Sequence, residues 1–509
     1  MGYKYLSLKL PPGFTPEQLR HKIGKALRIN TFSFQIIRQG LDARKKGFIH
    51  WEIRLMVQSP EIKGDPPDRP EILKIPHTNT KKRAVVVGSG PAGFFAALVL
   101  QKGGVRTTLI ERGTEVSKRS SEIEIFEKTG QFFSRSNYAF GEGGAGTFSD
   151  GKLTSRSKGI SLERQFILKS YVEAGGPEEI QYLSYPHLGT DKLRVIVKNL
   201  RKSFLDLGGN ILFETQMTDI KAKNGTVFSI ETDKGRLEAD YFILAIGHSA
   251  FDTFRMLIKR GIRFHIKNFA LGCRMEHPQE LINRAQWGVN RLPGVKAAEY
   301  HLTSPGTGGH PVYSFCMCPG GKVVPATAYK NTNIVNGMSR YQRDGRFANA
   351  ACVAGVNLGS MLHYEVSALE SLDWLEKLEQ SFYNLMKGYQ APFCTIQSFL
   401  HQKMMPGNTQ TSYPMGIVEA PLWEMLPQEI SRAMRKGLQD FSKKIKGFET
   451  GNLLGLESKT SAPVQADREK NGLCTGFQNL YLVGEGSGYS GGIVSSAADG
   501  IKAAMDILL

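Results

Sequence analysis

The chain has 509 residues, of which 41% are hydrophobic and 22% are charged; this composition is typical of a folded globular protein and excludes a disordered one. At ordinary domain sizes this length predicts two to four domains. No apolar run approaches the ~18 residues of a membrane-spanning helix, and the N-terminus lacks the apolar segment of a signal peptide. We therefore expect a cytoplasmic protein with no transmembrane segment.

The charge is basic, with 65 Lys and Arg against 47 Asp and Glu and a formal net charge of +18. Residues 1–80 contribute 14 basic and 7 acidic side chains, so much of the excess lies near the N-terminus. A basic protein favours anionic partners such as nucleotides, acidic metabolites, RNA or lipid headgroups. No long basic run is present and we do not expect DNA binding; a surface that serves mainly solubility is the alternative explanation.

Residues 1–75 have the pattern of a small α+β module. Strands are predicted at 3–10, 32–38 and 48–57. Between the first two, a helix is predicted to begin at Pro16, where Thr15 can cap it and Gln18 completes a capping box. A Pro-rich extended connector follows at 59–80.

The strongest motif lies at 88–93 and reads Gly-Ser-Gly-Pro-Ala-Gly. It follows an apolar strand predicted at 84–87 and opens a helix, which is the context of a dinucleotide-binding turn. Gly88 permits the tight turn, Gly90 lets the backbone approach a pyrophosphate, and Gly93 lets helix and strand pack closely. The free N–H groups at the helix N-terminus favour phosphate, so the motif predicts a Rossmann-like domain with a bound dinucleotide.

Glu111 ends the next predicted strand, 107–110, and lies 23 residues after Gly88. A carboxylate at this place accepts hydrogen bonds from a ribose diol and repels a 2′-phosphate. The nucleotide is therefore expected to be FAD or NAD, not NADP. A plain NAD dehydrogenase without flavin is the alternative at this point.

Three further Gly-rich segments belong near such a ligand. The loop at 141–153, GEGGAGTFSDGKL, presents backbone amides and short polar side chains that suit a long polar ligand. A buried strand within 239–246 leads directly into Gly247. At 481–492 the sequence YLVGEGSGYSGG opens the last predicted helix, whose N-terminus could stabilise negative charge on a reduced flavin.

The order of these segments resembles the two-dinucleotide-binding-domain flavoproteins related to glutathione reductase. In those proteins an Asp of a C-terminal GD motif holds the ribityl chain, and here Glu485 takes that place. More closely, GEGGAGTFSDGKL, ALGCRMEHPQ, FCMCPGGKVV, NGMSRYQRDG and ESKTSAPV resemble a bacterial family described only as FAD-dependent dehydrogenase or NAD(P)/FAD-dependent oxidoreductase. LDARKKG at 41–47 is similar to a segment of that family's basic N-terminal module, so the resemblance spans the chain. It implies FAD and leaves the substrate open.

The resemblance also implies a set of cofactor contacts. On the adenosine side these are Gly88, Gly90, Pro91, Ala92, Gly93, Glu111 and Arg112. Along the pyrophosphate and flavin they are Gly143, Gly144, Thr147, Lys152 and Gly247, and at the ribityl chain and ring they are Gly484, Glu485, Gly491, Gly492 and Ile493. No His or Cys near a Gly-rich flavin loop marks a covalent link, so we expect FAD to be held non-covalently, and we expect no metal.

The cysteines are too few and too scattered for a disulfide framework. No second GxGxxG follows a strand, and no CxxxxC is present, which argues against a lipoamide- or glutathione-type reductase. NAD(P)H is then expected, if at all, as a transient electron donor at the flavin face. Cys316 and Cys318 form a CxC, which strand spacing would place on one face; they are either two buried small side chains or a redox or metal pair.

Candidates for catalysis come from polar groups outside the Gly-rich loops. Flavin-dependent oxidation needs an anchor or a base for the substrate. Lys459 and Thr460, in ESKTSAP, are the first choice, followed by Arg274 and Glu276 in CRMEHPQ. A structural ion pair between Arg274 and Glu276 is the alternative for the latter two.

These observations predict an α/β fold with three parts. They are a small N-terminal α+β module, a discontinuous Rossmann-like FAD-binding domain, and an inserted α+β substrate or cap domain. The expected boundaries are 1–75 for the module, 76–265 and 450–509 for the FAD-binding domain, and 266–449 for the cap.

The leading hypothesis is an FAD-dependent oxidoreductase that acts by hydride transfer on a small, anionic substrate. The alternative is a flavoprotein whose basic N-terminal module binds RNA or a membrane surface. Aromatic residues interleaved on a basic face would favour RNA, but at strand spacing Tyr3, Tyr5, Phe32, Phe34 and Trp51 are more typical of a core.

Overall fold

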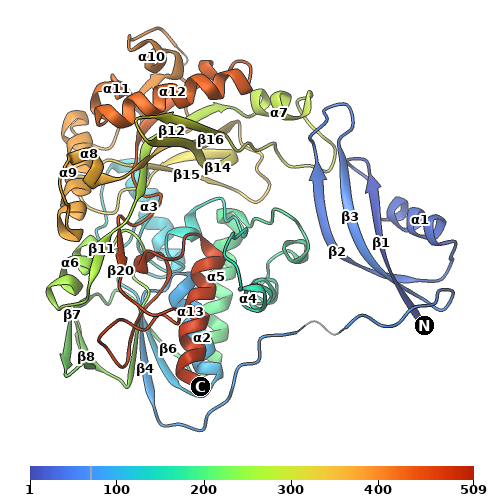
Figure 1. Cartoon of the computed structure of the whole chain (residues 1–509), viewed down its shortest axis with the longest axis horizontal. Coiled ribbons are helices and arrows are strands. Elements are labelled where there is room, and N and C mark those ends of the chain that lie inside the picture. The colour runs from blue at the N-terminus through green and yellow to red at the C-terminus, as the bar shows by residue number, and fades with distance from the viewer. Residues whose placement is uncertain (69–70, 408) are drawn as a thin grey trace.

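The computed structural model describes residues 1–68, 71–407 and 409–509 (Figure 1). The N-terminal module lies at one side of the molecule and an extended segment joins it to the remainder. Residues 69–70 of the predicted connector are outside the described part. Beyond the connector, a Rossmann-like domain and a larger antiparallel cap domain lie against each other, as Figure 1 shows.

The module is a three-stranded antiparallel sheet with one helix. Its elements are β1 (Gly2–Leu10), α1 (Pro16–Leu27), β2 (Ser33–Asp42) and β3 (His50–Ser59), in the sheet order β1-β3-β2. The predicted capping box is confirmed, because Thr15 and Gln18 each accept a hydrogen bond from the other's backbone N–H. Leu19 and Ile23 of α1 pack in the core with Phe32, whereas Tyr5 is exposed. RNA or membrane binding by this module stays a prediction.

Strand β2 attaches the module to the FAD-binding part. The N–H of Gln39 donates to the carbonyl oxygen of Tyr182 (2.9 Å), and the N–H of Ser184 donates to the carbonyl oxygen of Gln39 (2.8 Å). Arg38 Nε donates to Ser184 Oγ at 3.1 Å. The module therefore touches the loop before α5.

The Rossmann-like domain has a parallel sheet. Its strands are β4 (Arg83–Val87), β5 (Arg106–Ile110), β6 (Asn210–Leu212), β10 (Tyr241–Leu244) and β21 (Leu480–Leu482), in the order β21-β10-β4-β5-β6. One face packs on α2 (Pro91–Lys102), α4 (Ser161–Glu173), α5 (Gly189–Asp206) and α13 (Ile493–Leu508). The other face packs on β7 (Met217–Lys223), β8 (Thr226–Thr232), β9 (Gly235–Glu238) and α6 (Phe251–Lys259). Because both faces of the sheet are covered, the central strand β4 is buried and continuously apolar from Ala84 to Val87, as predicted.

The remaining elements are α3 (Val116–Thr129), the 3₁₀ helices η1 (Ala145–Phe148), η2 (Glu178–Gln181), η3 (Phe448–Thr450) and η4 (Gly484–Ser487), and the paired strands β11 (Phe264–Ile266) and β20 (Val464–Ala466).

The cap is a large, mainly antiparallel sheet. Its strands are β12 (Phe269–Pro278), β13 (Thr303–Thr307), β14 (His310–Pro325), β15 (Val335–Ser339), β16 (Phe347–Val356), β17 (Ala391–Thr395), β18 (Ile417–Glu419) and β19 (Asn452–Glu457). The order is β13-β14-β16-β12-β19-β17-β18, with β15 paired to β14. Its helices are α7 (Gln279–Trp287), α8 (Leu358–Leu362), α9 (Ala368–Met386), α10 (Ile396–His401), α11 (Leu422–Met425) and α12 (Gln428–Lys444).

The cap sheet runs past the boundary expected at 449/450. Strand β19 begins at Asn452 and pairs with β12 and β17, so the chain returns to the Rossmann-like part only after Glu457. Among the described residues, no helix combines the length and the apolar character that crossing a membrane requires.

Candidate FAD site and adjoining thiol chamber

A cavity of about 1500 Å³ lies between the carboxyl ends of β4, β10 and β21 and the cap sheet. It exceeds the ~300–1,000 Å³ of an ordinary ligand pocket, so it has room for a large cofactor and a second molecule. Most of the predicted cofactor residues line it: Gly88, Gly90, Pro91, Ala92, Glu111, Arg112, Gly144, Lys152, Gly247, Gly484, Glu485, Gly491, Gly492 and Ile493. Segments far apart in sequence therefore meet at one cavity.

The turn before α2 has the geometry of a phosphate cradle. Gly88 has φ +98°, and a Cβ there would lie 2.4 Å from the carbonyl oxygen of Ala245, so the position requires Gly. Gly90 is the N-cap of α2, with no side-chain cap. A Cβ on Gly90 would meet only Gly144 Cα, at 3.8 Å, and would otherwise project into open space. An uncapped helix N-terminus beside open space fits a diphosphate.

Three predicted cofactor residues lie behind the cavity wall instead. A Cβ on Gly93 would be 1.9 Å from the carbonyl oxygen of Gly88, which confirms close helix–strand packing. Gly143 and Thr147 line a separate small cavity of about 30 Å³ beneath the N-terminus of α2. Gly143 and Thr147 do not line the large cavity, and their contact with the cofactor stays a prediction.

Glu111 connects the loops around the cavity. Its Oε2 accepts hydrogen bonds from the N–H (2.9 Å) and Oγ (2.8 Å) of Ser89, and its Oε1 accepts from the N–H groups of Gly113 (2.9 Å) and Gly141 (3.1 Å). The carboxylate thus holds three Gly-containing turns together. Its contact with a ribose stays a prediction.

Arg112 forms part of the same wall. Its guanidinium pairs with both oxygens of Asp252, at 3.0 and 3.1 Å, and donates to Thr253 Oγ1 at 2.7 Å. The ring of Phe140 lies 4.3 Å from the guanidinium carbon. Burial lowers the pKa of Arg112, but Asp252, Tyr329 and Glu111 together raise it by more, so the side chain is a fixed cation.

A second helix N-terminus faces the cavity at α13. Gly492 is its N-cap, with φ +89° and no side-chain cap. Glu485 lies on the nearby wall; burial raises its pKa to about 8, although the Lys267 ammonium lowers it. At this end of the cavity the chain therefore offers free N–H groups and a carboxyl group that holds its proton.

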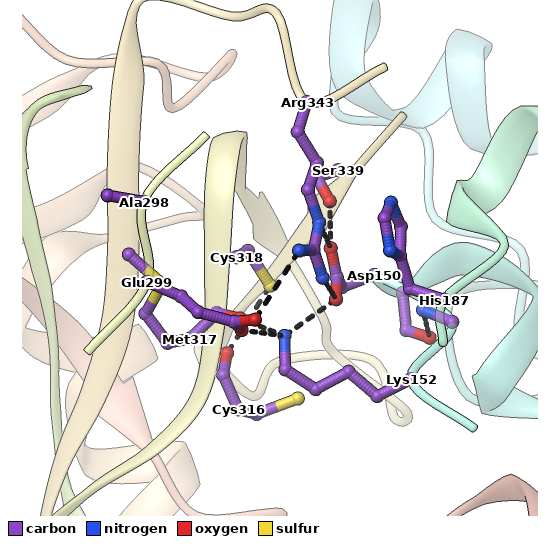
Figure 2. Close-up of polar contacts among 12 residues, drawn as sticks. Asp150, Lys152, His187, Ala298, Glu299, Cys316, Met317, Cys318, Ser339 and Arg343 are labelled. Atoms are coloured by element: carbon purple, nitrogen blue, oxygen red, sulfur yellow. Dashed lines mark hydrogen bonds and ion pairs between the residues drawn. The ribbon is translucent and has the colours of Figure 1, made fainter. Parts of the chain in front are cut away.

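The cap side of the cavity carries a charged cluster of Asp150, Lys152, Glu299 and Arg343, called here the Lys152 cluster (Figure 2). Lys152 Nζ lies 2.6 Å from Asp150 Oδ2 and 3.5 Å from Glu299 Oε2, and it donates to the carbonyl oxygen of Met317. Arg343 makes a bidentate pair with Asp150, at 3.0 and 2.6 Å. Two cations and two carboxylates balance, so the cluster adds no net charge.

Mutual pairing keeps the groups of the cluster ionised. Burial raises the pKa of Asp150, but Lys152 and Arg343 lower it far more, to well below its usual range. Burial lowers the pKa of Lys152 and Asp150 raises it, with a net increase. Burial lowers the pKa of neighbouring His187 to about 4, so this imidazole is neutral near pH 7.

Cys316 and Cys318 adjoin this cluster on β14. The strand carries a bulge between Phe315 and Cys318, and Cys316 has φ +45°. The predicted placement of both thiols on one strand face is therefore wrong: Cys316 lines the cavity, whereas Cys318 is buried beneath it. Figure 2 shows the two sulfurs on either side of Met317, with Lys152 nearby.

Arg274 and Glu276 do not reach the cavity. Arg274 is completely buried behind β14, where it pairs with Glu457 at 3.3 Å and not with Glu276. Glu276 accepts hydrogen bonds from Ser412. The two side chains point from strand β12 into the protein interior, so the prediction that they contact substrate is corrected.

Lys459 and Thr460 do line the cavity. Lys459 Nζ lies 2.8 Å from Glu379 and 3.8 Å from the centroid of the Phe251 ring. Burial lowers its pKa, and the Glu379 carboxylate opposes this. Thr460 Oγ1 donates to the carbonyl oxygen of Ala270 at 2.9 Å. Both side chains are held by the protein, so their catalytic role stays a prediction.

The sequence does not predict Glu299 and Arg343 as site residues. Neither lies in a Gly-rich loop, and 44 positions separate them. Arg343 belongs to the segment NGMSRYQRDG, which offered a cue, but its partner Asp150 lies in a different domain. Only the folded sheet brings these side chains together.

Two family models match the chain. Residues 268–460 match FAD-dependent protein, C-terminal domain-like, and residues 82–254 match Pyridine nucleotide-disulphide oxidoreductase. An uncharacterized protein of Clostridium beijerinckii is 38% identical over 512 residues, which cover 96% of this chain and 95% of that one.

Solved structures of flavoproteins are more distant. A flavoprotein/dehydrogenase from Cytophaga hutchinsonii is 13% identical, covering 84% of this chain and 78% of its own, with a TM-score of 0.36. A geranylgeranyl bacteriochlorophyll reductase-like protein from Thermoplasma acidophilum has the same identity, coverage and score. CtdE in complex with FAD is 10% identical, with 84% coverage of each chain and a TM-score of 0.36.

Proposed function

Since this chain belongs to the family of FAD-dependent proteins that includes its Clostridium beijerinckii relative, we propose that it acts by hydride transfer on a small molecule held beside the Lys152 cluster. It is an FAD-binding oxidoreductase by its family models. The proposal adds where the substrate lies, which groups hold it and that FAD is bound without a covalent link.

Hydride transfer to or from the substrate is the chemistry that FAD supplies when bound. The N-terminus of α2 would hold the diphosphate, with Gly90 leaving room for it. Glu485 and the N-terminus of α13 would lie beside the ribityl chain and ring. A glutathione-reductase-like placement of the cofactor is part of this proposal.

One observation carries the proposal: both helix N-termini and the Lys152 cluster open into the same cavity of about 1500 Å³. A cofactor that begins at Gly90 and ends near Gly492 would therefore share its space with a substrate at Lys152. Residues of cap strand β14, from Tyr313 to Met317, line that end of the cavity.

Within this space the chain positions the substrate but adds little charge of its own. Lys152 and Arg343 already pair with carboxylates, so they hold the side chains of the cavity wall in place. They leave no unpaired cation in the cluster for a substrate anion. Glu299 keeps a partly exposed carboxylate; burial raises its pKa, and Lys152 and Arg343 together lower it to below its usual value. It is the group that would accept a proton from a substrate N–H or O–H.

An anionic part of the substrate would lie at the cavity mouth. Arg38, from the N-terminal module, and the exposed Arg156 line it. Among the described residues, neither makes an ion pair with a carboxylate. Through Arg38, the basic N-terminal module would take part in binding the substrate of the oxidoreductase.

The purified protein tests this function by its visible spectrum, followed by anaerobic addition of NADH and then NADPH. Flavin bands that bleach with a pyridine nucleotide would support a reductase that takes its electrons from that donor. Flavin bands that persist would support a substrate-driven dehydrogenase, and the search would turn to reduced acidic metabolites. Absence of flavin after reconstitution with FAD would contradict the proposal.

A further inference from the structure

We propose that Cys316 and Cys318 form a redox-active dithiol–disulfide pair that exchanges electrons with FAD and reacts with small disulfide compounds. This inference rests on the proposed function, because FAD must occupy the cavity that Cys316 lines. It is a different arrangement from a CxxxxC in the nucleotide-binding domain, since the pair lies on strand β14 of the cap.

The two thiols differ in access. Cys316 is partly exposed at the cavity wall, whereas Cys318 and the other described cysteines are buried. A reagent that enters the cavity can therefore reach Cys316 first. Cys318 becomes accessible only through Cys316, as an attacking and a resolving thiol require.

The backbone brings the two residues together. From Phe315 to Cys318 the chain advances three residues while its partner β16 advances two, from Ala351 to Asn349. Cys316 is the non-Gly residue at φ +45° within this bulge. The thiol of Cys318 lies 3.3 Å from the carbonyl oxygen of Cys316 as a result. Bulges and residues in such sparsely populated backbone conformations are found preferentially beside active sites.

Arg274 supports the pair from below. Its Nη2 donates to the carbonyl oxygen of Cys316 at 2.7 Å and to Cys318 Sγ at 3.3 Å. Arg274 is thus a positioning residue under the thiols. Its buried guanidinium and the Lys152 ammonium are the cations that would stabilise a thiolate.

The charges around Cys316 favour its thiolate on balance. A hydrogen bond from Cys318 lowers the pKa of Cys316 most, burial raises it, and Arg274 and Lys152 lower it further, so the net pKa is lower than usual. The pKa of Cys318 is raised in turn. The carboxyl groups that face the pair are Asp150, Glu457 and Glu485, and they oppose the thiolate.

The reaction consists of two successive thiol–disulfide exchanges. The Cys316 thiolate attacks one sulfur of a small disulfide and expels the first thiol. Cys318 then loses its proton and attacks the Cys316 sulfur, so the second thiol leaves and a Cys316–Cys318 disulfide remains. The Cys316–Cys318 disulfide returns to two thiols by gaining two electrons and two protons. Bound reduced FAD would supply these electrons, and a pyridine nucleotide or another two-electron donor would restore them.

The first experiment counts thiol release from the native holoprotein treated with 4,4′-dithiodipyridine, a small neutral disulfide. The wild type is expected to release two thiopyridones per chain and to lose 2 Da in the peptide that holds both cysteines. Cys318→Ala should release one and retain a mixed disulfide at Cys316. Cys316→Ala should release none on the same timescale, because Cys318 is buried.

Cys352→Ala is the matched control, since Cys352 is buried on neighbouring β16 and should leave the count at two. A wild type that releases no thiopyridone, or only one with a lasting mixed disulfide, would overturn the pair.

The second experiment tests exchange with FAD by anaerobic titration of the oxidised holoprotein with dithionite. The wild type and Cys352→Ala should take up four electrons per FAD, two for the flavin and two for the disulfide. Cys316→Ala and Cys318→Ala should take up two. Uptake of only two electrons by the wild type would overturn the inference and leave the proposed function standing. A visible spectrum without flavin bands after reconstitution would instead contradict the proposed function.

Discussion

Gly90 and Gly93 lie within one turn of α2, yet the structure assigns them different tasks. Gly90 has an ordinary φ of −66°, and the space beyond its Cα is the cavity. Gly93 is enclosed by the carbonyl oxygen of Gly88 and by Ala245. The first position is therefore small because of what the cavity holds, and the second because of how helix and strand pack.

Gly90→Ala should weaken FAD binding by about 10- to 100-fold, the effect of about 1–3 kcal/mol of overpacking, and leave the fold intact. FAD affinity of the apoprotein, measured by flavin fluorescence, checks this. Gly47→Ala is the control, because a Cβ at Gly47 meets nothing within 4 Å. Unchanged FAD affinity in Gly90→Ala would contradict the placement of the diphosphate.

Glu485 should make the stability of the apoprotein depend on pH. Its pKa is raised by burial to about 8 in the folded state, so folding favours the protonated form. The contribution to the free energy of unfolding is complete below the unfolded pKa, near 4.5, and is lost as the pH rises toward 8. The Tm of the apoprotein is expected to fall over this window by more than the Tm of Glu485→Gln.

That comparison isolates Glu485 because Glu142 and Glu457, whose pKa values are also raised to about 7, remain in both proteins. Parallel Tm profiles for the wild type and the variant would show that the Glu485 carboxyl is not buried in the apoprotein.

At the scale of elements, α2 is the central buried helix of the nucleotide-binding domain. It is buried from Ala92 to Leu100 and packs on β4 and α13. Gly93→Ala would place a methyl group 1.9 Å from the carbonyl oxygen of Gly88. We expect it to destabilise the apoprotein by about 1–3 kcal/mol in urea unfolding, whereas Gly90→Ala changes apoprotein stability little. Equal stability of the two variants would contradict this division of roles.

Elements with a strong local pattern could be predicted from the sequence, and those that depend on distant partners could not. The helix that begins at Pro16 carries its own capping box, and the strand at 84–87 is a continuous apolar run; the sequence located both. The bulge in β14 has no local signal, because it exists relative to β16. Arg274 was misjudged for the same reason, since its burial depends on sheet neighbours far along the chain.

The whole molecule shows why the candidate site was found only in part. The part proposed to hold the cofactor is built from Gly-rich turns. Their conformations depend on the local sequence, so most of them were predicted. The part proposed to hold the substrate joins Lys152 from the nucleotide-binding part with Glu299 and Arg343 from the cap. Arg38 reaches the mouth from a third part, and no spacing in the sequence links these residues.

Arg38 and Arg156 should attract anions to the cavity mouth. In Arg38→Ala and Arg156→Ala, the rate at which Cys316 reacts with the dianion 5,5′-dithiobis(2-nitrobenzoate) is expected to fall at least about threefold at low salt, and less at high salt. The rate with neutral 4,4′-dithiodipyridine should not change. Lys45→Ala removes an exposed cation that does not line the cavity and serves as the control. An equal fall with both reagents would point to a distorted mouth instead.

The central claim is that the cavity at Gly90 holds one FAD without a covalent bond, and the FAD content of the purified chain tests it most directly. After reconstitution with FAD and removal of excess, heat denaturation should release one FAD per wild-type chain into the supernatant and clearly less per Gly90→Ala chain. Flavin that stays attached to the denatured chain, or equal FAD in both proteins, or no bound FAD at all, would contradict the account.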